Sequence, residues 1–366
     1  MAIVASGAVS FSDLRTEFSG AGAISFSDLY RGGTLVKGNA ANNTATNLAA
    51  SVPTSGTINF TNFRSTAKGW RKTFASGATN QNASTIFGSD YGVNYPKEIV
   101  INSGVTLGAT STSDEALEIN TGGIGSITVT NNGTLQGAGG AAGADGGDAF
   151  EAFVACTFVN NGTVQAGGGG GGNGGQGGGG SYSTTSNNYS SWRYQTPATY
   201  IWYQGGSARY IYWGGSTFTM PSYYSGTSYY VSSGSLGGLT YQRGTKRYDD
   251  SNDSGVIYYE IRRYNTSTTT TNTNGGSGGA GGAGAGYLQS VANGSSGSSG
   301  GTNAGNGGSG GNGGGFGASG SNGNSGANGN RTNGSGGGSG GASGKYIRGI
   351  SFVTFTNNGT VAGGTA

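Results

Sequence analysis

Short runs of alternating apolar and polar residues occupy the chain from Trp70 to about Leu135. The segments EIVINSGVTLGA, ALEINTGG and GSITVTNNGTLQG alternate in this way, and Gly or Asn interrupts them. A period of two residues is typical of β-strands with one buried face, and Gly and Asn are typical of turns. The pattern predicts short strands joined by tight turns over residues 70–136.

One phrase of this pattern recurs farther along the chain. It reads TNNGTLQGAGG at 130–140, VNNGTVQAGGG at 159–169 and TNNGTVAGG at 356–364. In each copy a strand pattern leads into Asn-Asn-Gly-Thr and then into glycine, and such copies indicate repeats of one structural unit. Because a long segment separates the second copy from the third, we expect one scaffold that closes at the C-terminus around an excursion.

The first 69 residues carry a different repeated phrase, VSFSDL at 9–14, ISFSDL at 24–29 and INFTNF at 58–63. In the first two copies a Ser precedes an Asp by three residues, which is the pattern of a capped helix start. The short helices cannot bury an apolar face alone, so two interpretations stay open: they attach to another protein, or they fold back on their own chain. The candidate attachment residues are Phe11, Leu14, Phe18, Phe26, Leu29, Phe60 and Phe63.

Glycine dominates two tracts, at about 137–180 and 275–344, and follows a strict period in the second. It occupies every third position from Gly305 to Gly329, and the series resumes in phase at Gly338 after Thr332 and Ser335 interrupt it. A flexible linker would not hold this phase, and a collagen helix needs Pro, which the tract lacks. The remaining regular structure is the polyglycine II helix, with three residues per turn.

A polyglycine II helix has no internal hydrogen bonds, so its backbone groups need partners on neighbouring segments. Glycine lets backbones approach closely enough for such bonds because it has no Cβ. We therefore expect several of these helices to pack side by side. Such packing also suits the composition, since 82 of the 366 residues are Gly and only 33% are hydrophobic.

The segment between the tracts, residues 181–274, contains most of the 21 Tyr and three of the four Trp. Phrases such as WRYQTPATYIWYQGGSARYIYWGGS alternate aromatic and polar residues and predict β-hairpins that turn at Gly-Gly. Aromatic, Ser, Gly and Asn residues together are typical of recognition loops, although aromatics also dominate any core of such a segment. The candidate receptor contacts are Trp192, Tyr194, Trp202, Tyr203, Tyr210, Tyr212, Trp213, Tyr223, Tyr224, Tyr229 and Tyr230.

The remaining chemistry of the chain is sparse. The chain has no His and a single Cys, Cys156, which excludes the common zinc sites, Ser-His-Asp triads and disulfides. Residues 249–260 resemble a calcium loop, but Ser254 stands where that loop needs Gly, so we favour a solvated acidic turn and expect no metal or other cofactor.

A net charge of +3 gives no reason to expect nucleic-acid binding, and the excess of Arg and Lys over acids in 181–274 suits an anionic glycan. No signal peptide or membrane span is recognisable, so we expect synthesis in a cytoplasm without membrane insertion.

The run from a strand into glycine, as in SITVTNNGTLQGAGG and FVNNGTVQAGGGGGG, resembles the glycine-rich receptor-binding adhesins at the tips of T-even-type bacteriophage long tail fibres. The ISFSDL phrase is similar to fibre proteins of marine phages. The resemblance implies an attachment region, a sandwich of polyglycine II helices and loops that bind the host surface. It also implies two partners, the tail-fibre shaft protein and a host surface protein or lipopolysaccharide, and a place at the distal end of the fibre in the virion.

These observations predict a mainly β and irregular fold in four parts. They are an attachment segment with short helices (1–69), a short-strand β domain (70–136), a polyglycine II scaffold (137–180 and 275–366) and an aromatic receptor-binding insert of β-hairpins (181–274). The predicted function is a non-enzymatic phage adhesin that binds a host receptor. The alternative is a self-assembling structural protein of the virion, in which the insert is a subunit interface.

Overall fold

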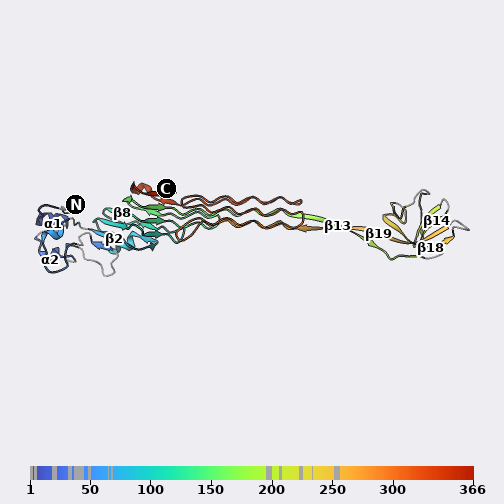
Figure 1. Ribbon diagram of the computed structural model, residues 1–366, viewed down its shortest axis with the longest axis horizontal. Helices are drawn as coiled ribbons and strands as arrows, with labels where there is room; N and C mark the ends of the chain where they lie inside the picture. Colours follow the sequence, from blue (N-terminus) through green and yellow to red (C-terminus); the bar gives the residue numbers. More distant parts are fainter. Residues whose placement is uncertain are drawn as a thin grey trace. The chain divides into compact units, whose positions relative to one another are not determined.

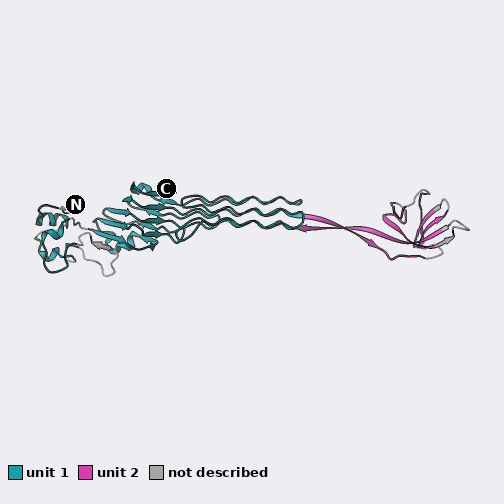
Figure 2. Cartoon of the chain, in the orientation of Figure 1, with its two compact units in different colours: residues 1–180, 273–366 teal, residues 181–272 magenta. Residues whose placement is uncertain are grey.

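The computed structural model describes residues 3, 6–18, 23–31, 35–36, 45–47, 51–64, 66, 69–194, 200–205, 208–221, 226–232, 234–250 and 256–366. The chain forms two compact units, residues 1–180 with 273–366 and residues 181–272, coloured separately in Figure 2. The fold is mainly β, as the alternating pattern predicted. None of the helices in the described part of the chain is long and apolar enough to span a membrane.

The strands of the first unit form three sides of a parallel β-helix. The first side contains β2 (Trp70–Phe74), β5 (Lys97–Ile101), β8 (Ile127–Asn131), β11 (Cys156–Asn160) and β21 (Val353–Asn357). The second contains β3 (Ala78–Thr79), β6 (Thr106–Gly108), β9 (Thr134–Gln136), β12 (Thr163–Gln165) and β22 (Thr360–Ala362). The third contains β4 (Gln81–Asn82), β7 (Leu117–Ile119), β10 (Phe150–Ala152), β20 (Lys345–Ile347) and β23 (Gly364–Thr365). On the first two sides, each strand pairs in parallel with the strand one coil later. On the third side, β4, β7 and β10 pair in this way, as do β20 and β23, and a single parallel bridge between Glu151 and Arg348 links β10 to β20. Strand β1 (Ala45–Asn47) pairs antiparallel with β2.

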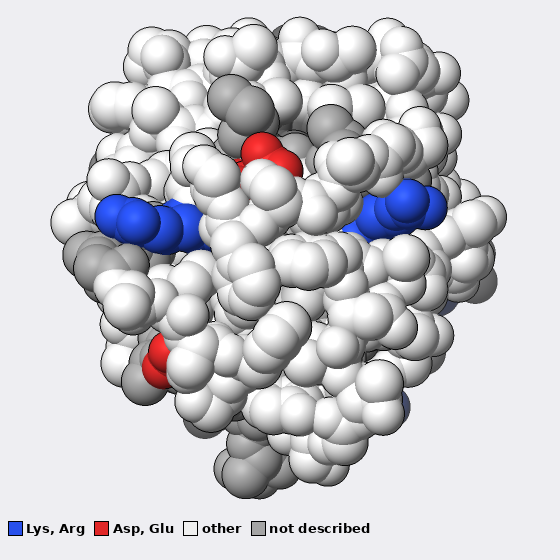
Figure 3. All heavy atoms as spheres, turned by 90° about the vertical axis from the view of Figure 1, so that its left-hand side faces the viewer, with Lys and Arg blue, Asp and Glu red and all other residues white. Residues whose placement is uncertain are grey.

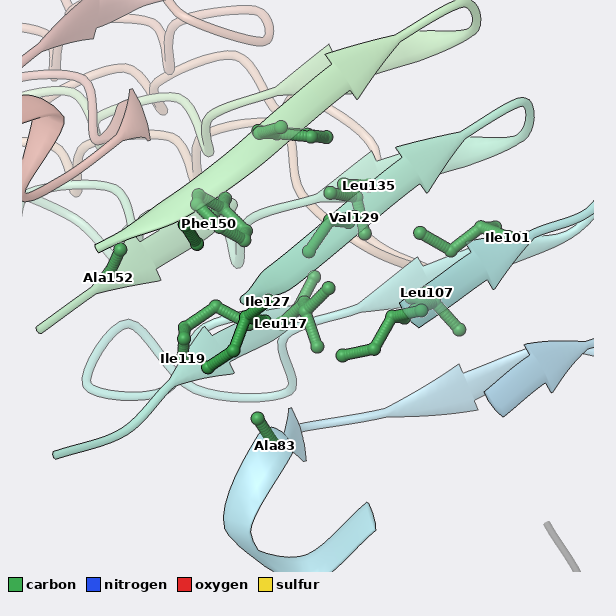
Figure 4. Close-up of a cluster of buried hydrophobic side chains, with 14 of the residues drawn as sticks. Ala83, Ile101, Leu107, Leu117, Ile119, Ile127, Val129, Leu135, Phe150 and Ala152 are labelled. Carbon is green, nitrogen blue, oxygen red and sulfur yellow. The ribbon is translucent and has the colours of Figure 1, made fainter. Parts of the chain in front are cut away.

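The inward side chains of these strands make one core. Alternate residues of β5 and β8 are buried, and Ile99 and Val129 have no exposed surface. Figure 4 shows the apolar side chains of β7, β8, β9 and β10 pointing into the space between the sheets. The helix α3 (Ala83–Phe87), which is followed by η2 (Gly88–Asp90), adds Ala83 and Phe87 to this core. Burial of these side chains stabilises the β-helix by the hydrophobic effect.

The Asn-Asn-Gly-Thr copies stack directly on one another. The Asn131 side-chain amide donates to Asn160 at 2.8 Å, and Asn160 donates to Asn357 at 2.8 Å, across sequence separations of 29 and 197 residues. Val159 pairs with Thr356 in the same register. The expectation of a scaffold that closes at the C-terminus around an excursion is therefore confirmed. The 3₁₀ turn η3 (Ile350–Phe352) precedes the last coil.

Both glycine-rich tracts leave the β-helix at the same corner. Residues 137–149 run from β9 to β10, and the segment between β12 and β20 starts at residue 166 and ends at 344. Within these stretches, residues 137–149, 166–179 and 274–344 form no helix or strand, and their traces run side by side (Figure 1). Adjacent segments bond at every third residue: Gly168, Gly171, Gly174 and Gly177 donate to Ala285, Gly282, Gly279 and Gly276 at 2.8 Å each. We call this array of segments the glycine lattice.

The close spacing of segments in the glycine lattice requires glycine. A Cβ added to Gly171 would lie 2.0 Å from the Gly311 carbonyl oxygen, and one added to Gly311 would lie 2.0 Å from the Ser321 carbonyl oxygen. Any larger residue would force these segments apart and break their hydrogen bonds. Glycine therefore acts here through close approach.

The N-terminal segment forms a small core of its own within the first unit. The helices α1 (Phe11–Glu17) and α2 (Phe26–Leu29) and the 3₁₀ helix η1 (Phe60–Phe63) each start with a capping box, as the repeated phrase predicted for the first two. Four of the seven candidate attachment residues are buried in this core: Leu14, Phe18, Leu29 and Phe63. These four side chains pack on their own chain, so for them the attachment prediction is wrong and the fold-back interpretation holds.

The second unit is an antiparallel sheet. Its strands are β13 (Gly180–Tyr189), β14 (Tyr200–Gly205), β15 (Ala208–Trp213), β16 (Ser216–Thr219), β17 (Ser228–Val231), β18 (Leu239–Asp250) and β19 (Val256–Thr273). The longest strand, β19, pairs with β13, β14 and β18. Trp202, Ile211, Tyr241 and Ile261 lie in its core and are almost fully buried.

Candidate functional site

Two of the eleven predicted receptor contacts lie in the core of the second unit. Trp202 has no exposed surface and Trp213 is 9% exposed. Both belong to the cluster that holds the sheet together, so they offer no surface to a partner and the prediction is wrong for them. Tyr223 and Tyr224 lie outside the described residues.

Three other predicted contacts lie side by side on strands β14 and β15. Tyr203 and Tyr210 have ring centroids 5.3 Å apart, and those of Tyr210 and Tyr212 are 6.0 Å apart. Tyr258 of β19 adds a fourth ring, 5.4 Å from Tyr203. Burial, together with the neighbouring tyrosines, raises the pKa of Tyr212, so its hydroxyl is a neutral hydrogen-bonding group at physiological pH.

The most exposed predicted contacts are Trp192, Tyr194 and Tyr230. Trp192 is 39% exposed, and Tyr230 is the most exposed of the three at 59%. Tyr229 is half-buried because its ring packs on Phe218.

Trp192 belongs to an aromatic and arginine cluster that sequence reasoning did not assemble. The Arg262 guanidinium carbon lies 3.9 Å from the ring centroid of Tyr189 and 4.4 Å from that of Trp192. Tyr264 is next to Tyr189, with ring centroids 5.0 Å apart. We call Tyr189, Trp192, Arg262 and Tyr264 the Arg262 cluster.

Backbone pairing and packing hold the Arg262 cluster in place. Arg193 and Ile261 exchange two backbone hydrogen bonds of 2.9 Å, which sets Trp192 beside Arg262. The Arg262 Nε donates to Gln242 Oε1 at 2.8 Å. The Trp192 ring rests on Gly244, where an added Cβ would lie 2.6 Å from it. The ring and the guanidinium are thus oriented before any partner arrives, which lowers the entropy cost of binding.

A cavity of about 280 Å³ borders the Arg262 cluster. Tyr189, Tyr264 and Arg263 line it, together with Asn188, Ser190, Leu239 and Asn265. Its groups are aromatic faces, amides, hydroxyls and a guanidinium. This combination can stack on a flat ligand, bond to its hydroxyl groups and attract an anion.

A group of acidic residues lies in the first unit, on the third side of the β-helix. A cavity of about 90 Å³ is lined by Asp114, Glu115 and Glu118, with Asn80, Gln81 and Asn82. Ligand pockets usually have about 300 Å³ or more, so a saccharide does not fit here. Within the described residues, no three His, Cys, Asp or Glu are placed to hold a metal ion.

One carboxyl of this acidic region titrates far from its ordinary range. Burial, then the charge and hydrogen bond of Glu151, raise the pKa of Glu115 from 4.5 to about 7. The Asp148 and Glu151 carboxylates lie beside Arg348, whose Nε is 2.5 Å and 3.8 Å from them. Glu115 has no such cation partner among the described ion pairs, so its neutral form is favoured.

We predict that protonation of Glu115 makes the free energy of unfolding depend on pH. Between pH 4.5 and 7 the folded state binds more protons at Glu115 than the unfolded state, so the free energy of unfolding falls as pH rises. Glu115→Gln should therefore be more stable than the wild type at pH 8, by about 1 to 2 kcal/mol after solvent screening, and nearly equal at pH 4. Thermal unfolding at both pH values measures the difference, with Glu98→Gln as the control. A pH-independent difference would contradict this origin.

The candidate calcium loop at 249–260 does not have the form of one continuous loop. Asp249 is in strand β18 and Glu260 is in β19, which are antiparallel neighbours, and Glu260 pairs with Arg247. Residues 251–255 lie outside the described residues.

Comparison with known proteins places these features in a family. The family model for the phage tail fibre adhesin Gp38 matches residues 57–256, which is more than half of the chain. In a search of solved structures, the crystal structure of the gp37-gp38 adhesin tip complex of the bacteriophage S16 long tail fiber matches with 16% identity and a TM-score of 0.38, over 99% of this chain and 100% of that one. No curated protein matches the chain. The chain belongs to the phage tail fibre adhesin Gp38 family.

Proposed function

We propose that this phage adhesin binds a receptor on the host bacterial surface, an outer-membrane protein or a glycan, through the second unit. The Arg262 cluster is the observation that carries the proposal. The Tyr189 and Trp192 rings are exposed, while Arg262 and Tyr264 are half-buried. The chain itself holds all four side chains in place, next to a cavity of about 280 Å³. Oriented aromatic and arginine side chains of this kind supply much of the binding energy in recognition surfaces. The proposed activity is binding without catalysis.

We propose a second contact, between the N-terminal segment and the shaft protein of the tail fibre. Each short helix begins with one candidate phenylalanine, and these three side chains cluster at the surface. The ring centroids of Phe11 and Phe26 are 5.2 Å apart, and those of Phe11 and Phe60 are 5.1 Å apart. Phe11 is 38% exposed and Phe26 is 45% exposed. Figure 3 views the first unit from the side on which α1 and α2 are drawn, and most of this face is uncharged. Exposed clustered aromatics suit a protein contact.

The glycine lattice is a further part of the first unit. We propose that its segments are polyglycine II helices packed as a sandwich, because their hydrogen bonds recur at every third residue and run between segments. In this proposal the protein is made in the host cytoplasm and ends at the distal tip of the fibre. The solved bacteriophage S16 structure contains a gp37-gp38 complex, and by analogy we propose a gp37-like shaft partner here.

The receptor proposal predicts that Trp192→Ala and Arg262→Gln each weaken host-cell binding by about tenfold or more. Each change removes one side of the stack that orients the other. Binding of the purified whole chain to host cells measures the effect, with Tyr182→Ser as the matched control, because Tyr182 is also exposed at 38% but lies outside the cluster.

Two outcomes would contradict this receptor assignment. If the two variants bind cells as well as the wild type, the Arg262 cluster is not the receptor site. If the wild type binds no host of the phage and the second unit instead associates with other virion proteins, the structural alternative replaces the adhesin proposal.

A further inference from the structure

The first unit contains a polar pocket of about 300 Å³ where residues 329–335 turn from one lattice segment into the next. Three primary amides line it, from Gln176, Asn274 and Asn333. Two hydroxyls, of Thr332 and Ser335, and the guanidinium of Arg331 complete the polar lining, and no acidic residue lines the pocket. Arg331 carries the single charge in residues 275–344.

The two interruptions of the glycine period fall in this pocket. Thr332 and Ser335 occupy positions where the series calls for Gly, and both use their hydroxyl groups to hold the opposite segment. Thr332 Oγ1 accepts a hydrogen bond from the Gly179 amide at 2.7 Å, and Ser335 Oγ accepts one from the Gln176 amide at 2.7 Å. The chain thus departs from glycine here to build polar walls, while the segments stay attached to each other.

The backbone around Arg331 is fixed by the same contacts. The Arg331 and Thr332 amides both donate to the Gly179 carbonyl oxygen at 3.1 Å. The guanidinium lies against Gly179, since a Cβ there would be 2.8 Å from Arg331 Nη2. Within the described residues, this guanidinium has no hydrogen bond or ion pair from the protein. The side-chain amides of the pocket also have no protein partner among the described residues.

We propose that this pocket binds an acidic saccharide, in which a sugar carries a carboxylate or phosphate. The Arg331 fork would bind the oxyanion, because guanidinium and oxyanion form paired, charge-assisted hydrogen bonds. The amides of Gln176, Asn274 and Asn333 can both donate and accept, which is what sugar hydroxyl groups require. The site shares no residue with the Arg262 cluster. The assignment rests on the proposed function only for the source of the saccharide, the host surface.

Binding of free sugars to the whole chain tests the proposal without host cells. We expect glucuronic acid and glucose 1-phosphate to bind at least about tenfold more tightly than glucose in a ligand-observed NMR titration, because only the first two carry an oxyanion for Arg331. The two acids also show which oxyanion the pocket prefers. Arg331→Gln should lose about tenfold or more in affinity for both, and Arg331→Lys should retain part of it as a point charge. Arg71→Gln is the matched control, since it removes one positive charge of the first unit outside the pocket.

Several results would overturn the proposal. These are equal binding of glucose and the acidic sugars, unchanged affinity in Arg331→Gln, and inorganic phosphate binding as tightly as glucose 1-phosphate, which would make this a simple anion site. Asn333→Ala provides a second pocket variant that keeps the charge of Arg331. It should weaken binding of the acidic sugars more than binding of inorganic phosphate. Thermal unfolding verifies that each variant is folded. If the wild type fails to bind host cells, that result counts against the proposed function. The sugar titration still tests this pocket, because it uses free sugars and no cells.

Discussion

Gly337→Ala is expected to lower the free energy of unfolding of the first unit by about 3 kcal/mol or more. A Cβ at this position would lie 2.1 Å from the Gly323 carbonyl oxygen and 2.8 Å from that of Asn324. The two segments must move apart, which strains or breaks the bonds that Gly323 and Gly326 donate to Gly338 and Ser335, each 2.9 Å long. Overpacking costs about 1 to 3 kcal/mol and each lost hydrogen bond about 1 kcal/mol.

The neighbouring Gly336 provides the matched control. A Cβ added there meets no atom within 4 Å, although the residue is in the same tract and the change in sequence is the same. Gly336→Ala should therefore be neutral or raise stability by about 0.4 to 1 kcal/mol, because alanine restricts the unfolded chain more than glycine does. Chemical denaturation of the three proteins measures both effects. Equal stability of the two variants would contradict a lattice that needs glycine at specific positions.

The glycine period indicated contact at every third residue, but it could not indicate which segments are neighbours. All segments share one composition, and the period is the same for parallel and antiparallel neighbours. In the structure, Gly168 bonds to Ala285 in an antiparallel segment, whereas Gly169 bonds to Ala318 in a parallel one. Adjacent residues of one segment thus bond to different neighbours, and only the folded chain determines the pairing.

The Asn-Asn-Gly-Thr phrase predicted a repeated unit, and the structure adds how the copies pair. Alternation with period two is the same for hairpins and for a parallel β-helix, so the parallel pairing was not readable from it. The sequence suggested that this phrase contains glycine because glycine favours turns, but the structure shows a different reason. A Cβ on Gly162 would lie 2.1 Å from the Gly133 carbonyl oxygen of the coil before it. Close stacking of coils therefore requires this glycine.

The candidate contacts of the second unit were harder to predict because both faces of its strands are aromatic or apolar. In β14, Ile201, Trp202 and Tyr203 follow one another, and two of these three are fully buried. Without a polar face, alternation does not indicate which aromatic residues are exposed. Arg262 is next to a second arginine, Arg263, in β19, so the sequence did not single it out. Its stacking partner Tyr189 is also far away in sequence.

The attachment proposal predicts that the triple variant Phe11→Ser, Phe26→Ser and Phe60→Ser loses at least about 100-fold in affinity for the shaft protein. The three side chains start three copies of the same capped turn, so they form three similar contacts around one centre. The three single variants should then have similar effects, about tenfold or less each, as expected for partly exposed side chains that share one contact.

Co-purification of the whole adhesin with the shaft protein of the same phage measures this loss. Phe352→Ser is the matched control, because Phe352 is 46% exposed but lies in η3, outside the N-terminal segment. The three changes should leave the small core intact, since Leu14, Leu29 and Phe63 beneath them stay buried in their own chain. Retained binding by a folded triple variant would show that the shaft is held elsewhere. One dominant single variant would indicate an attachment surface without the threefold equivalence that the repeated phrase implies.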